Sequence, residues 1–147
     1  MDMSKKEYDE MVKKASPNSR LFTNCAKAFV VGGLICTFGQ VLYALFGALG
    51  ANKDMSGMLV AVSLIFLAAL ATGFGKYDNL VKFAGAGAGV PITGFANAVA
   101  APAIEFKKEG YIMGVGAKMF LIAGPVIVYG TLTSMIVGIV YYFTNVR

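Results

Sequence analysis

The side chains that carry out most enzymatic chemistry are scarce in this sequence. It contains no histidine, which is the commonest general base in enzymes. Its two cysteines, Cys25 and Cys36, form no CxxC pair, and none of the eight acidic residues belongs to a cluster with metal-ligand spacing. The sequence therefore predicts no catalytic residue, no bound metal and no cofactor.

A run rich in glycine and proline is the part of the chain best suited to hold or pass a solute. Four glycines and Pro91 fall within the ten residues from Gly85 to Gly94. Relative to alanine, glycine costs a helix about 1 kcal/mol and proline about 3 kcal/mol, so we predict a break at Gly87, Gly89 and Pro91. Irregular backbone inside a membrane is tolerated only where protein buries it or water fills a cavity beside it. The run therefore favours a transport pathway, and the alternative is a kinked helix that packs closely through its glycines.

A few polar residues accompany this run and suit an anionic solute. The residues after Pro91 could begin a half-helix whose amino terminus carries partial positive charge, with Thr93 and Asn97 one turn apart on one face. Lys118 lies within an apolar run, where a lysine at the bilayer centre costs about 2.5–3.5 kcal/mol. It therefore faces a cavity or a partner, or it snorkels to the interface. The candidate pathway residues are Gly85, Gly87, Gly89, Pro91, Thr93, Gly94, Asn97 and Lys118.

Long apolar stretches must position these residues. Charged residues make up 14% of the chain, against about 25% in a typical soluble protein, and apolar residues make up 57%. Four charge-free stretches each exceed the roughly 20 residues that a helix needs to cross a bilayer. We predict an all-α membrane protein, a bundle of about four membrane segments with a broken third segment, in one transmembrane domain over residues 28–147. The expected segments are about 28–50, 57–75, 83–104 and 111–143, and the third either spans the membrane or re-enters.

Residues 1–27 form a charged segment ahead of the first span. Ser4–Glu7 matches a capping box, and apolar residues from Tyr8 to Ala15 recur at helical spacing. Ser16–Asn18 contains a proline and ends that pattern. We expect an N-terminal amphipathic helix on the membrane surface, with a solvated tail as the alternative.

Basic residues indicate the topology. Six of them precede the first span, which places the amino terminus in the cytoplasm by the positive-inside rule. The count barely separates a spanning from a re-entrant third segment. The net charge of +5 is spread over the ends of apolar runs, without a basic stripe interleaved with aromatic residues, so we expect no nucleic-acid partner.

Two apolar stretches carry small residues at every fourth position. Such a face lets another helix approach closely in a membrane, and it more often holds a bundle together than binds a ligand. The first face is Ala28, Gly32 and Cys36, and the second is Gly130, Ser134 and Gly138.

Three strings in the sequence resemble the stage V sporulation protein A membrane subunits. They are Phe29–Cys36, Thr72–Asp78 and Phe83–Asn97, and the last of them, with its Gly-Ala-Gly-Ala-Gly-Val-Pro-Ile core, is specific. The resemblance covers most of the chain from Lys27 onward.

The resemblance implies a multi-pass protein of the spore inner membrane in endospore-forming bacteria. It implies a channel or transporter subunit that moves dipicolinic acid, as its calcium chelate, during sporulation and germination. The implied partners are an AE-like membrane subunit and a soluble thiolase-like subunit, with membrane lipid around the helices. The alternatives are a structural scaffold subunit of such a complex and a tension-gated pore without solute specificity.

Overall fold

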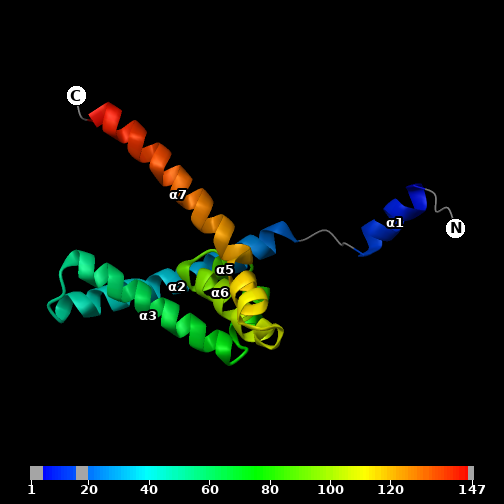
Figure 1. Cartoon of the computed structure of the whole chain (residues 1–147), viewed down its shortest axis with the longest axis horizontal. Coiled ribbons are helices and arrows are strands. Elements are labelled where there is room, and N and C mark those ends of the chain that lie inside the picture. The colour runs from blue at the N-terminus through cyan, green and yellow to red at the C-terminus, as the bar shows by residue number, and fades with distance from the viewer. Residues whose placement is uncertain (1–4, 16–19, 146–147) are drawn as a thin grey trace.

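The computed structural model describes residues 5–15 and 20–145, and within these ranges every regular element is helical (Figure 1). The three long helices are α2 (Leu21–Ala48), α3 (Lys53–Gly73) and α7 (Ala117–Asn145). The shorter elements are α1 (Lys5–Ala15), α4 (Tyr77–Ala84), α5 (Ala86–Gly89), α6 (Ile92–Glu105), the 3-10 turn η1 (Phe106–Glu109) and the π-helical turn η2 (Tyr111–Gly116). The predicted capping residue Ser4 and the predicted helix end at Ser16–Asn18 lie outside the described residues.

Three helices of the described chain are long and apolar enough to cross a membrane. They are α2, α3 and the continuous run Tyr111–Asn145 through η2 and α7, with mean hydropathies of 1.9, 2.2 and 1.9. Few of their residues are buried within the chain, as expected of helices that face lipid. The prediction of an all-α membrane protein is confirmed.

The third predicted segment is not one helix. It is divided into α4, α5 and α6, which have 8, 4 and 14 residues. At 1.5 Å per residue even α6 is about 21 Å long, which is shorter than the roughly 30 Å of a hydrocarbon core. The predicted break is therefore present, although none of its pieces crosses the membrane alone.

The broken segment turns back toward the end of α3, beside which it begins. Beyond the break, α6 runs beside α3 in the same direction. Asn97 contacts Thr72 near the end of α3, and Glu105, at the end of α6, lines the same small hollow as Gly75, just past the end of α3. Both ends of the segment therefore lie together, and its deepest point is the start of α6 at Ile92. This path fits a re-entrant segment better than a spanning one, a choice that the charge counts did not make.

The interior where these elements meet is built mostly from alanine. Small side chains let helices approach closely in a membrane, where lipid tails compete equally well for large apolar ones. The two buried clusters are Val31 with Ala84 and Ala88, and Ala68 with Tyr77 and Ala96.

Two elements lie outside this interior. Helix α7 contacts α6 and η2 near its start and then diverges from the other helices (Figure 1), so residues 125–145 are all exposed. In α1 the apolar residues Tyr8, Met11 and Val12 are exposed, and a membrane-surface position for this helix stays a prediction.

Candidate functional site: the broken membrane segment

The segment breaks at two points, one on each side of α5. At Gly85 the backbone has φ +56° and ψ −126°, a conformation that L side chains rarely adopt and glycine adopts readily. At Pro91 it has φ −58° and ψ 169°, which is extended, and the first bond of α6 runs from the Gly94 amide to the Pro91 carbonyl at 2.8 Å. Glycine and proline thus each produce one break, for backbone reasons. The prediction is correct at Pro91, but Gly87 and Gly89 lie within α5 and the first break is at Gly85.

Tyr77 satisfies a carbonyl group that the second break releases. A continuous helix would pair the Ala88 carbonyl with the amide of Ile92, which the extended Pro91 moves away. The Tyr77 hydroxyl instead donates to the Ala88 carbonyl at 2.9 Å, and Tyr77 is buried. Such replacement partners are what a break at membrane depth requires. No sequence pattern singled out Tyr77, because its partner lies in another element.

Gly87 and Gly94 are required by close packing. A Cβ on Gly87 would collide with the carbonyl oxygen of Ala28 and would lie 2.6 Å from the Ala28 Cα. A Cβ on Gly94 would lie 2.6 Å from the Ala88 carbonyl oxygen. A Cβ on Gly32 would in turn lie 3.3 Å from the Gly87 carbonyl oxygen. The predicted small-residue face of α2 is therefore occupied by α5 at Ala28 and Gly32.

The two polar residues of the half-helix, Asn97 and Thr93, differ in their hydrogen bonding. Asn97 accepts a hydrogen bond from the Thr72 hydroxyl of α3 at 2.8 Å, so it fastens α6 to α3. Thr93 is 6% exposed, and its hydroxyl oxygen makes no hydrogen bond within the described residues. One turn of helix therefore separates a satisfied polar group from an unsatisfied one.

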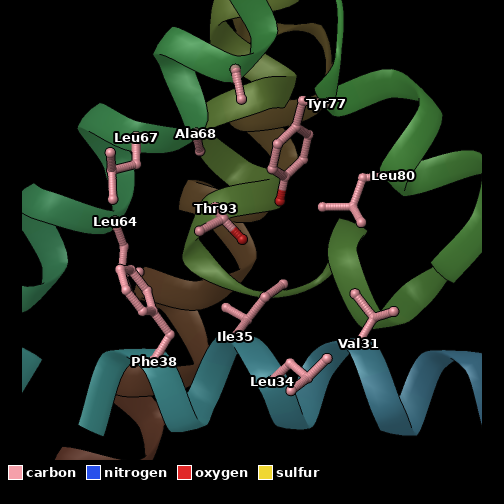
Figure 2. A pocket seen from close by; sticks show the side chains of 11 residues that line it. Val31, Leu34, Ile35, Phe38, Leu64, Leu67, Ala68, Tyr77, Leu80 and Thr93 are labelled. Atoms are coloured by element: carbon pink, nitrogen blue, oxygen red, sulfur yellow. The ribbon is translucent and has the colours of Figure 1, made fainter. Parts of the chain in front are cut away.

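Thr93 faces an apolar cavity of about 400 Å³ (Figure 2). Its hydroxyl and the ring of Tyr77 point into the space, above Ile35 and Leu34 of α2. The remaining walls come from α2, α3 and α4, and no charged residue lines it.

A second, more polar hollow of about 270 Å³ lies beside the first break. Its lining includes Asn24 at the start of α2, Lys82 of α4 and the exposed Gly85. Lys27 stands close by, with its Nζ 4.8 Å from the centre of the Phe83 ring. None of the residues that line this hollow is acidic, so the charge of Lys82 makes it positive, and we call it the cationic hollow.

One face of α5 and of the second break is exposed. The residues on it are Gly85, Ala86, Gly89 and Val90, and Val90 is 79% exposed. This face continues from the cationic hollow and lies opposite the buried residues Ala84 and Ala88. Of the predicted glycines, Gly85 and Gly89 are therefore exposed, whereas Gly87 and Gly94 are packed against backbone.

Lys118 lies apart from the break. Its Nζ is 4.7 Å from the centre of the Phe106 ring, and Phe106 directly follows the returning end of α6. Lys118 lines neither the apolar cavity nor the cationic hollow. The structure thus does not bring it to Thr93 and Asn97, because Phe106 lies past the C-terminal end of α6, whereas Thr93 and Asn97 lie in its first two turns.

Comparison with known proteins identifies the family. The model of the SpoVAC/SpoVAEB sporulation membrane protein family matches residues 24–140. The chain is 45% identical over 139 residues to "Stage V sporulation protein AC" of Bacillus subtilis (strain 168), covering 94% of this chain and 93% of that protein. No solved structure matches. The chain belongs to the SpoVAC/SpoVAEB family of sporulation membrane proteins.

Proposed function

We propose that this protein is a channel or transporter subunit that moves a small organic anion across the spore inner membrane. The solute that the family resemblance implies is dipicolinic acid as its calcium chelate, moved during sporulation and germination. The family supports a role in the membrane during sporulation. The transported solute and the inner-membrane location are part of the proposal.

The observation that carries the proposal is the exposed backbone of the break beside a cationic hollow. Backbone at membrane depth must meet protein or water, and Gly85, Gly89 and Val90 are exposed within the described chain. Water along this face would provide a path. The adjoining Lys82 and Asn24 would attract and bind an anion at its mouth.

The half-helix α6 adds a favourable field along this path. Its 14 residues begin at Ile92, at the deepest point of the segment, so its partial positive charge lies inside the membrane. Transporters commonly direct the amino termini of broken helices at anionic groups in this way. Pro91, which starts the half-helix, would set the direction of that field.

The proposed orientation places the mouth in the cytoplasm. Five basic residues precede α2 and a sixth, Lys27, lies in its second turn, and the cationic hollow is formed by the start of α2 and by α4. With a re-entrant segment, Lys107 and Lys108 fall on the same side. Lys118, held at Phe106 beside the returning end of α6, would be a second cation at that surface.

Assembly with other subunits is also proposed. The resemblance implies an AE-like membrane subunit and a soluble thiolase-like subunit. The exposed stretch 125–145 of α7 supports assembly, because its small-residue face is unused within the described chain. The same observation favours the alternative of a scaffold subunit, which holds partners together without lining the path.

Flux of calcium dipicolinate from liposomes containing this chain and its two proposed partners tests the proposal. Lys82→Gln should lower the flux by about tenfold at low salt and less at high salt, because electrostatic attraction at a mouth is screened. The matched control is Lys53→Gln. Lys53 begins α3, whereas Lys82 lies in α4, which follows the other end of α3, so this substitution should leave the flux unchanged.

Assembled complexes that transport equally well with Lys82→Gln would contradict the proposed mouth. A complex that assembles but passes no dipicolinate would favour the scaffold. Flux of unrelated solutes of the same size at the same rate would favour a tension-gated pore without specificity.

A further inference from the structure

We propose that the apolar cavity beside Thr93 binds a membrane-dissolved amphiphile with an aliphatic chain of about ten carbons and an uncharged oxygen-bearing group at its end. A fatty alcohol and a protonated fatty acid share this chemistry. The proposal concerns the cavity side of the segment and does not depend on transport along the exposed face of the break.

The unsatisfied Thr93 hydroxyl is the first observation. It is 94% buried, has no partner in the described chain and points into the cavity (Figure 2). A buried hydroxyl without a hydrogen bond is unfavourable, so most such groups have a partner in the occupied state. The other polar lining residue, Tyr77, already donates its proton to the Ala88 carbonyl. Thr93 therefore remains available to a ligand.

The position of Thr93 decides the kind of polar group. It lies in the first turn of α6, where the amides precede the first bond of the helix and the helix end is partly positive. An acceptor oxygen is favoured there and a cation is disfavoured. A dianion such as dipicolinate is excluded by the remaining walls, because no lysine or arginine lines the cavity to compensate its charge.

The lining residues and the volume of the cavity indicate the polarity and size of the rest of the ligand. The cavity is lined mostly by aliphatic and aromatic side chains from the middle of α2 and the second half of α3, two helices long and apolar enough to cross a membrane, which places it at hydrocarbon depth. Its volume of about 400 Å³ corresponds to roughly thirteen atoms or groups of about 30 Å³ each, the volume of a water molecule in the liquid. That size fits a chain of about ten carbons with its terminal oxygen.

The route of entry is lateral. Three lining residues are also exposed on the outside of the chain, namely Leu34 at 64%, Phe38 at 46% and Leu67 at 45%. They form the edge of the cavity between α2 and α3, which faces the hydrocarbon core. A molecule dissolved in the bilayer reaches the cavity without crossing water.

Photolabelling of the purified full chain in lipid nanodiscs tests this assignment. The probe is decanol carrying a diazirine in its chain, and the labelled peptides are identified by mass spectrometry. We expect labels on α2, α3 and the start of α6, and unlabelled decanol should compete better than decane. Thr93→Val should lower the labelling about threefold to tenfold, the range that one neutral hydrogen bond provides, and Thr93→Ser should restore it.

A substitution that fills the cavity provides a second test in the same photolabelling experiment. Ala71→Leu adds bulk inside the cavity and should abolish the labelling, whereas Ala44→Leu, at an exposed position of α2 outside it, should not. Equal labelling of Thr93→Val, Ala71→Leu and the parent would mean that the probe only partitions into lipid, and would overturn the assignment. Loss of labelling when the partner subunits are added would overturn it too, since a partner side chain would then fill the space.

Discussion

Helices α2 and α7 carry the same pattern of small residues at every fourth position, and they use it differently. On α2, Ala28 and Gly32 receive the backbone of Gly87, at a distance that no Cβ on Gly87 would allow. On α7, a Cβ on Gly130 or Gly138 would meet nothing within 4 Å. The pattern therefore indicates that another element can pack closely on the helix, but not which element does so. On α2 that element is α5, which the two breaks at Gly85 and Pro91 separate from its neighbours.

The largest effect that this comparison predicts comes from adding one methyl group to each glycine face. Gly87→Ala places its Cβ against the backbone of Ala28, which cannot rotate away, so we expect the free energy of unfolding to fall by about 3 kcal/mol or more. Gly138→Ala should leave it unchanged or raise it by up to about 1 kcal/mol, because alanine favours a helix. Thermal unfolding of the purified variants in detergent measures both. Equal stabilities would mean that α5 does not pack on α2.

A hydroxyl deletion in each region gives the next largest difference. Tyr77→Phe leaves the Ala88 carbonyl without its donor at the break, which should cost about 1–3 kcal/mol of unfolding free energy. Tyr129→Phe, on the exposed part of α7, should change it by less than about 0.5 kcal/mol. Thermal unfolding and the yield of folded protein report the two effects. A fully stable Tyr77→Phe protein would show that another group satisfies the carbonyl.

The break was largely predictable from sequence, and its surroundings were not. Glycine and proline act on their own backbone, so the break at Pro91 could be predicted from local rules, whereas the other break lies at Gly85 and not at the predicted Gly87 and Gly89. The role of Gly87 depends on Ala28, which is far away in the sequence and reaches it only after folding. Tyr77 was missed for the same reason.

The polar candidates illustrate the same limit. Thr93 and Asn97 share one face of a predicted half-helix, yet Asn97 is satisfied by Thr72 and Thr93 is not. Their difference depends on how α3 lies against α6. Lys118 was grouped with them because it is charged within an apolar run, whereas the structure pairs it with Phe106 of the turn after α6. Charge and hydropathy give the cost of burying a side chain but not its partner.

The smallest predicted effects concern this lysine. Lys118→Met removes the interaction with the Phe106 ring, worth about 0.5–2 kcal/mol for this partly buried pair, and should lower anion flux without reducing the amount of assembled complex. Lys118→Arg keeps the cation over the ring and should retain more of the flux. The flux loss in Lys118→Met should be smaller than in Lys82→Gln, since Lys118 lines neither hollow. If both Lys118 variants transport like the parent, this lysine only anchors α7 at the interface.

Water access to the break tests the central claim most directly. In a chain with Cys25→Ser and Cys36→Ser, single cysteines are introduced by Val90→Cys at the break and by Val137→Cys on the exposed part of α7. A water-soluble thiol reagent attacks thiolates, which form in water and not in lipid. We expect rapid modification of the Val90→Cys variant in the assembled complex, slowed by dipicolinate, and no modification of the Val137→Cys variant. An unreactive Val90→Cys variant would contradict a water-filled path along the broken segment.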